Sequence, residues 1–227
     1  MSGNSAVSAQ RRNGDRHMIS RDYDSGSTKR QRTAFPEEST WPPHLCVHEI
    51  FERQAAKTPD TVAIISGNQE LTYRGLNIRA NQLAHHLRQL TSGMDVPIGI
   101  CVNPSLEMAI GILAILKAGA AYLPLDPAVS HEQLQYMLDH ALAPVVLTQN
   151  SAAGYLPRTR AARIFIDAVP SGSPENPRRR IAPGNLAYVT YTAGATGFPR
   201  AVAMPHRPLV NFLAWQSRAA GFSKPAR

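Results

Sequence analysis

A short segment rich in glycine and threonine is the strongest candidate for chemistry in this sequence. It follows a run of strand-forming residues at 186–191. Its two glycines allow the backbone to approach a ligand closely, so successive N–H groups can converge on anionic oxygens, and threonine hydroxyls add further donors. Arg200 lies three residues past the second glycine and can supply a positive charge. The pattern predicts a phosphate-binding loop with Arg200 as its cation, formed by Thr192, Ala193, Gly194, Ala195, Thr196 and Gly197.

The spacing within this segment leaves an alternative open. The segment matches neither the P-loop pattern G-x-x-x-x-G-K-[ST] nor the dinucleotide-binding pattern G-x-G-x-x-G. On spacing alone, an ordinary glycine-rich turn between two strands is the simpler interpretation.

Cysteine and histidine side chains do not indicate a metal site or a catalytic centre. Cys46 and Cys101 have apolar neighbours and lack C-x-x-C or Cys/His spacing, so neither a zinc site nor a disulfide is predicted. His85 and His86 lie beside an apolar helical stripe without a second ligand at metal spacing, and we expect them at the surface or at the core edge. No catalytic residue and no metal ligand is therefore identified.

Short predicted helices and strands alternate around the candidate loop. Apolar residues at helical spacing predict a helix from Leu76 to Leu90, and a helix that is apolar on nearly every side follows Ser105 as its cap. Continuous apolar runs, which are typical of parallel strands covered on both faces, occur at 97–102, 120–125 and 145–148. The expected fold class is α/β, with layered βαβ units and a mostly parallel sheet.

Local signals predict further features. Ser130 and Gln133 have the spacing of a capping box that opens a helix. A short strand is expected over residues 163–167. The run from Arg178 to Arg180 lies in a stretch rich in proline and glycine, and it favours a solvated loop over a binding patch.

Three segments read together resemble a known family. They are LTYRGL at 71–76, LKAGAAYLPLD at 116–126 and LAYVTYTAGATGFPR at 186–200. Their order and approximate spacing are those of the adenylation domains of nonribosomal peptide synthetases. VHEIFE at 47–52 is similar to the entry helix of that family, and HRPLVN at 206–211 resembles the segment after its phosphate loop. The resemblance covers residues 45–217 and implies the N-terminal portion of an AMP-forming adenylation domain.

The resemblance also implies an activity. The family condenses an amino-acid carboxylate with the α-phosphate of ATP, releases pyrophosphate, and passes the acyl group to the phosphopantetheine thiol of a carrier domain. It therefore implies ATP and Mg²⁺ as cofactors, with an amino acid and a carrier domain as partners. The loop at 192–197 would stabilise the departing phosphates electrostatically. The segment at 116–126 is expected to be architectural, because Lys117 and Gly119 end a buried helix.

The sequence departs from the family pattern at the loop itself. The family loop usually reads TSGSTGxPKG, whereas this chain has Ala193 and Ala195 for the two serines, Arg200 for the lysine and Ala201 for the following glycine. Two hydroxyl donors are lost, each worth about 1.5–3 kcal/mol toward a charged oxygen. Arg200 keeps the charge but not the compact geometry of lysine.

Length and charge bound the remaining interpretations. Residues 1–40 are predicted to be a disordered basic arm, and residues 41–227 a truncated N-terminal part of an adenylation domain without its later functional segments, so we expect no complete reaction from this chain alone. The formal net charge is +8, but residues 41–157 carry −3, which disfavours a nucleic-acid-binding core.

No apolar run reaches the length of a membrane span, and the cysteine usage fits a reducing cytosol, so a cytoplasmic location is expected. The alternative function is a non-enzymatic remnant or association module that completes its sheet with a partner chain.

Overall fold

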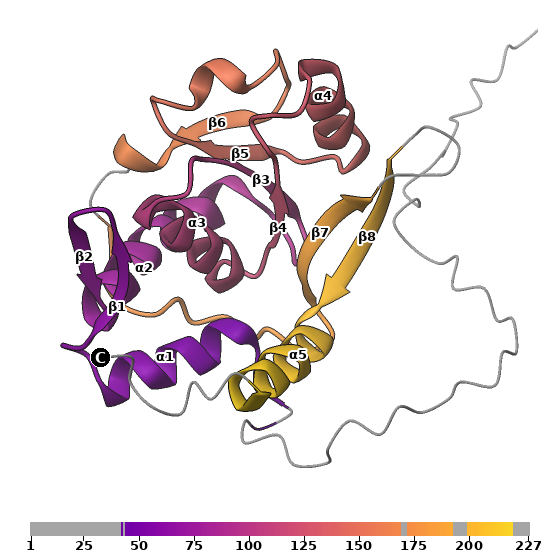
Figure 1. The fold of residues 1–227 in the computed structure, drawn as a ribbon. Coiled ribbons are helices and arrows are strands. Elements are labelled where there is room, and N and C mark those ends of the chain that lie inside the picture. The colour runs from indigo at the N-terminus through magenta and orange to yellow at the C-terminus, as the bar shows by residue number, and fades with distance from the viewer. Residues whose placement is uncertain (1–41, 43, 169–171, 193–198, 220–227) are drawn as a thin grey trace, which may run out of the picture. The chain divides into compact units, whose positions relative to one another are not determined.

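The computed structural model describes residues 42, 44–168, 172–192 and 199–219. The arm predicted over residues 1–40 lies outside them. Figure 1 shows the arrangement of the elements. The helices are α1 (Val47–Lys57), α2 (Tyr73–Leu90), α3 (Leu106–Lys117), α4 (His131–His140) and α5 (His206–Ala219), with 3-10 turns η1 (Ala153–Tyr155) and η2 (Ile166–Ala168). The strands are β1 (Val62–Ser66), β2 (Gln69–Thr72), β3 (Pro97–Cys101), β4 (Ala121–Pro124), β5 (Val145–Thr148), β6 (Ala162–Phe165), β7 (Leu186–Thr192) and β8 (Arg200–Pro205).

Six of these strands form one sheet in the order β6-β5-β3-β4-β7-β8. Neighbours from β6 to β7 are parallel, and β8 pairs with β7 in the antiparallel direction. Strands β1 and β2 form a separate antiparallel hairpin. The expected α/β class with a mostly parallel sheet is confirmed.

Alternate residues of the central strands face two different hydrophobic cores. Ile98 and Ile100 of β3 pack with apolar side chains of α2 and α3. Cys101 of the same strand, and Val146 of β5, pack with Leu134 and Leu138 of α4. Because successive side chains of a strand point to opposite faces, α2 and α3 cover one face of the sheet and α4 covers the other. All residues of β3 and β5 are buried, which explains their continuous apolar sequences.

The helix starts follow the capping signals only in part. Ser130 Oγ accepts a hydrogen bond from Gln133 N at 3.3 Å, as the capping pattern predicts. Ser105 is the N-cap residue of α3, but its side chain makes no capping bond. Its Oγ instead accepts a hydrogen bond from Gln149 Nε2 at 3.4 Å. The strand expected over 163–167 begins one residue earlier and gives way to η2 at Ile166.

The segment at 116–126 ends α3 and enters the sheet as β4, as expected. Lys117 ends α3 with its side chain fully buried, and Gly119 adopts φ +78° where the chain turns toward β4. Arg179 crosses this turn, and its Nη1 donates to Ala118 O at 2.9 Å while Nη2 donates to Gly93 O. The prediction of a solvated loop is therefore wrong for Arg179, because the free carbonyl of Ala118 at the end of α3, together with that of Gly93, offers acceptors to this cation. Arg178 and Arg180 are exposed.

Within the described part of the chain, no helix combines the length and apolar character required to cross a membrane.

Candidate phosphate-binding site

The predicted loop connects β7 to β8. Thr192 is the last residue of β7 and is paired across the hairpin with Arg200, the first residue of β8. The loop residues between them, Ala193, Gly194, Ala195, Thr196 and Gly197, lie outside the described residues. The pairing brings the two described ends of the segment together, and both the binding-loop interpretation and the simple turn require this arrangement.

The hairpin lies where ligands usually bind in open α/β sheets. Strand β7 runs parallel to β4, with Tyr188 opposite Tyr122, so Thr192 lies at the carboxyl end of a parallel strand. Such carboxyl ends form the ligand-binding edge of these sheets. Thr192 and Arg200 are both exposed, and neither side chain has a hydrogen bond or ion pair with another described residue. A hydroxyl and a cation are thus available at this edge.

A polar contact that sequence reasoning missed holds the end of β7 against α4. Tyr191 Oη lies 2.8 Å from His140 Nδ1, and it donates to Met137 O at 3.3 Å. The ring of Tyr136 packs against both, edge-on to Tyr191 and stacked on His140. Burial, followed by the proximity of Tyr136, raises the pKa of Tyr191 to about 12, so its phenol stays protonated at neutral pH. This contact fixes the residue that precedes the candidate loop.

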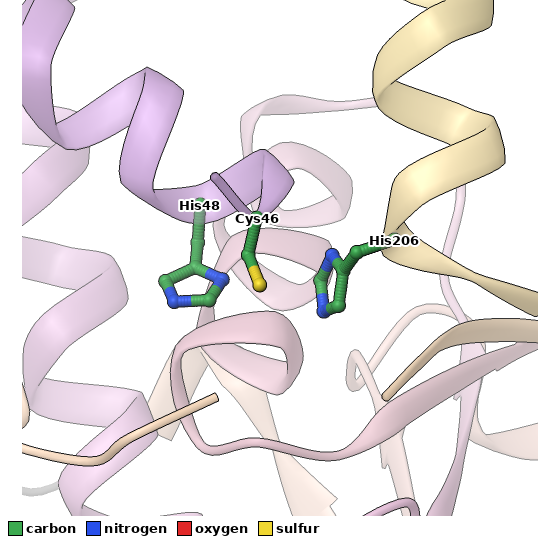
Figure 2. Close-up of side chains that lie close together, drawn as sticks. All are labelled: Cys46, His48 and His206. Atoms are coloured by element: carbon green, nitrogen blue, oxygen red, sulfur yellow. The ribbon is translucent and has the colours of Figure 1, made fainter. Parts of the chain in front are cut away.

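A second group of polar side chains is gathered where α1 and α5 begin. Cys46, His48 and His206 each offer one potential ligand atom, and these atoms lie within 4.8 Å of one another. Figure 2 shows the Cys46 sulfur between the two imidazole rings. All three residues are buried, with relative exposures of 0%, 5% and 0%. Sequence analysis did not predict this group because Cys46 and His206 are far apart along the chain. The one local signal was the spacing of Cys46 and His48, two residues apart.

Burial keeps the three groups uncharged at neutral pH. It lowers the pKa of His48 to about 3, with smaller contributions from His206 and Lys117. It lowers the pKa of His206 to about 4, against the opposing influence of Asp95. Burial also raises the pKa of the Cys46 thiol to about 12, and the Glu49 carboxylate adds to this rise. The group is a neutral thiol between two neutral imidazoles.

The described residues do not supply a ready cage for Mg²⁺. Among them, the one group of three or more His, Cys, Asp or Glu side chains close enough to share an ion is Cys46, His48 and His206. Mg²⁺ prefers oxygen ligands, which this group lacks. The described residues therefore do not fit a Mg²⁺ ion held by protein side chains alone.

The fold and the hairpin define an α/β protein with a candidate anion site at the carboxyl end of its parallel sheet. A family model described as "AMP-binding enzyme" matches residues 51–225, and the chain therefore belongs to the AMP-binding enzyme family. A linear gramicidin synthase of Brevibacillus parabrevis is 47% identical over 174 residues, which cover 75% of this chain and 3% of the relative. Malpinin synthetase of Mortierella alpina is 41% identical over 196 residues, covering 82% of this chain and 2% of the relative.

Solved structures agree with the sequence relatives. The crystal structure of the nonribosomal peptide synthetase FmoA3 (S1046A) superposes with a TM-score of 0.75 at 28% identity, covering 82% of this chain and 20% of that one. The N-terminal subdomain of Klebsiella oxytoca NpsA shares the fold, with a TM-score of 0.66 at 22% identity over 74% of this chain and 44% of that one. The resemblance to the N-terminal portion of adenylation domains of nonribosomal peptide synthetases is confirmed. The chain spans only a small share of the length of these synthetases.

Proposed function

We propose that this chain forms the phosphate-binding N-terminal portion of an amino-acid-activating adenylation domain. In this proposal, residues 192–197 and Arg200 hold the phosphates of ATP while an amino-acid carboxylate attacks the α-phosphate and pyrophosphate leaves. ATP with Mg²⁺, an amino acid, and a carrier domain bearing phosphopantetheine are the proposed cofactor and partners. The observation that carries the proposal is the pairing of Thr192 with Arg200 at the carboxyl end of β7, in a chain of the AMP-binding family.

The contribution of these residues is electrostatic. Donors and a cation fixed at the loop stabilise the negative charge that accumulates on the leaving pyrophosphate. Tyr191, held on α4 through His140 and Met137, keeps the start of the loop in place. Because Ala193 and Ala195 replace hydroxyl-bearing residues of the family pattern, the proposal includes weaker phosphate binding than a loop with both serines would give.

A binding experiment with matched variants tests the phosphate site. ATP affinity is measured by calorimetry for the 227-residue chain and for the Arg200→Ala, Arg158→Ala and Ala193→Ser/Ala195→Ser variants. We expect Arg200→Ala to weaken binding about tenfold or more, since a charge-assisted contact contributes about 1.5–3 kcal/mol. The paired serines should tighten binding by at least a similar factor. Arg158 is exposed and precedes β6, which lies at the opposite edge of the sheet from β8, so its variant is the charge-matched control.

The two arginine variants decide the site assignment. Equal losses for Arg200→Ala and Arg158→Ala would mean that ATP is attracted by net charge alone and would overturn the assignment. An unchanged affinity in the serine variant would show that residues 193 and 195 do not face the phosphates.

The complete reaction is a separate part of the proposal. We infer that the 227-residue chain does not catalyse amino-acid-dependent exchange of pyrophosphate into ATP, and the shared coverage of only 44% of the NpsA N-terminal subdomain supports this. The assay supplies each proteinogenic amino acid in turn with Mg²⁺, using an intact adenylation domain as the positive control. Exchange above background by the chain itself would refute this part and leave the phosphate-site assignment standing. The alternative association module gains no support from the comparisons.

A further inference from the structure

The buried group formed by Cys46, His48 and His206 has no part in the proposed adenylation chemistry. It joins two helix starts, because Cys46 is the N-cap residue of α1 and His206 is the first residue of α5. The two imidazole rings lie edge to face, with centroids 5.6 Å apart. The Cys46 sulfur lies between them, as Figure 2 shows.

We propose that Cys46, His48 and His206 form a structural zinc site that fastens the start of α1 to the start of α5. Thiolate sulfur and imidazole nitrogen are the ligands that Zn²⁺ prefers, and three protein ligands with a fourth position filled by water or a further side chain are a recurrent zinc geometry. Zn–S and Zn–N bonds of about 2.3 and 2.0–2.1 Å place ligand atoms less than about 4 Å apart. The present group, within 4.8 Å, must therefore contract by only about 1 Å.

Unsatisfied polar atoms support a ligand at this position. His48 Nδ1 and His206 Nε2 are buried and have no hydrogen-bond partner among the described residues. Buried polar atoms without partners are destabilising and call for an explanation. His206 Nδ1 accepts one hydrogen bond, from Val47 N at a long 3.3 Å, so a metal bond to the unpartnered Nε2 requires the ring proton to move to Nδ1 and this hydrogen bond to be given up. The Cys46 thiol points to Ile181 O at 3.5 Å, a weak contact that it can give up when it loses its proton.

The charges around the group are compatible with a cation. Lys117 affects His48 electrostatically, but its ammonium group is paired with the Glu52 carboxylate. The half-buried Glu49 carboxylate lies beside Cys46 and accepts the Cys46 backbone N–H at 2.7 Å. A Zn²⁺ ion bound to one thiolate carries a net charge of +1, and Glu49 places a negative charge next to it. Burial and the neighbouring Glu49 carboxylate raise the pKa of the Cys46 thiol, so in the proposed site it binds Zn²⁺ as the thiolate and releases its proton to solvent when the metal binds.

Metal binding at this position would act on the hairpin that contains the candidate loop. Helix α5 begins directly after β8, so a bond to His206 fixes the end of the β7–β8 hairpin opposite the loop to α1. The proposal does not depend on the adenylation function, since it concerns only how the described elements are held together.

Cobalt substitution provides the test, because Co²⁺ bound by a thiolate in tetrahedral geometry has strong visible bands and a sulfur-to-metal charge-transfer band. The full chain is purified with a reductant, stripped with a chelator, and titrated with Co²⁺ and then Zn²⁺. We expect a charge-transfer band that saturates at one Co²⁺ per chain, is displaced by Zn²⁺, and is accompanied by a higher melting temperature with Zn²⁺. The sequence has two cysteines, so the Cys101→Ser variant leaves Cys46 as the sole thiol, and it should retain the band.

Variants of the ligands complete the test. Cys46→Ser should abolish the charge-transfer band, and His206→Gln should weaken Co²⁺ binding at least tenfold, whereas His131→Gln, a change at an exposed histidine, should leave it unaltered. Loss of the band in Cys101→Ser, or no band in the unmodified chain, would overturn the proposal. The Cys101→Ser measurement remains decisive even if Cys46→Ser does not fold, because it keeps the proposed site intact. Equal Zn²⁺ affinity in His131→Gln and His206→Gln would also overturn it.

Discussion

Lys117 is a charged residue in the core. Its ammonium group contacts the Glu52 carboxylate and donates to Asn176 Oδ1 at 3.2 Å, while its side chain is fully buried. Burial lowers the pKa of Lys117, and the bond to Glu52 opposes this shift. Phe51 lies beneath the ammonium, with the ring centroid 6.0 Å away. The lysine therefore links α3 to α1 and to the segment that follows β6.

Replacing Lys117 by methionine should destabilise the protein through the charge left behind. Removal of one partner from a buried ion pair costs about 3–5 kcal/mol, and because Glu52 retains some exposure we expect about 3 kcal/mol from urea unfolding. The control is the double variant Lys117→Met/Glu52→Gln, in which no unpaired charge remains. It should be more stable than Lys117→Met alone, and strictly additive losses in the two single variants would contradict this account.

At the level of elements, the segment over residues 172–185 is held by polar contacts rather than by a strand or helix. Asn176 Oδ1 accepts hydrogen bonds from Asn77 and Asn81 of α2, each at 3.0 Å. Arg179 donates to Ala118 O at the end of α3 and to Gly93 O in the connection between α2 and β3. Just beyond, Asp95 accepts from Leu186 N at 2.7 Å and so positions the first residue of β7. Through these contacts, α2 and the end of α3 hold the segment that leads into β7 and the candidate loop.

Variants of two neighbouring arginines in this segment distinguish the effect of a structural hydrogen bond from the effect of net charge. Arg179→Ala should lower the free energy of unfolding by about 1.5–2 kcal/mol, because it removes charge-assisted hydrogen bonds to two backbone carbonyls. Arg178→Ala removes the same charge from an exposed side chain and should change stability by less than about 0.5 kcal/mol. Urea denaturation of both variants compares them directly, and equal effects would show that Arg179 acts only through net charge.

The sequence was sufficient for features that depend on neighbouring residues and insufficient for contacts made in three dimensions. Helical spacing from Leu76 to Leu90 and apolar runs such as 145–148 reflect burial of adjacent positions, so α2 and β5 could be predicted. The candidate loop was predicted directly after the strand at 186–191, and the structure places Thr192 as the last residue of β7. The contact of Tyr191 with His140 and the meeting of Cys46 with His206 depend on which elements become neighbours in the fold. Arg179 was missed for the same reason.

At the level of the whole molecule, stability depends on the protonation of its buried histidines. His48 and His206 are neutral when folded, with pKa values lowered to about 3 and about 4, whereas an unfolded histidine titrates near 6.5. Below about pH 6.5 the unfolded chain takes up protons that the folded chain does not. The contribution of the two neutral rings to stability is therefore fully present above this pH and is lost as the pH falls toward the folded values.

Metal-free protein should accordingly become less stable from about pH 6 to pH 4.5, with a contribution of about 1.4 kcal/mol per pH unit from each histidine. Urea unfolding in the presence of a chelator measures the slope, which should approach about 2.8 kcal/mol per pH unit from the pair. His206→Gln should reduce the slope by about half, because one proton uptake is removed, whereas His131→Gln should leave it unchanged, since this exposed side chain is not withheld from solvent in the folded state. If both variants kept the full slope, the acid sensitivity would have to arise from carboxylates instead, and the buried pair would not govern the stability of the fold in this range.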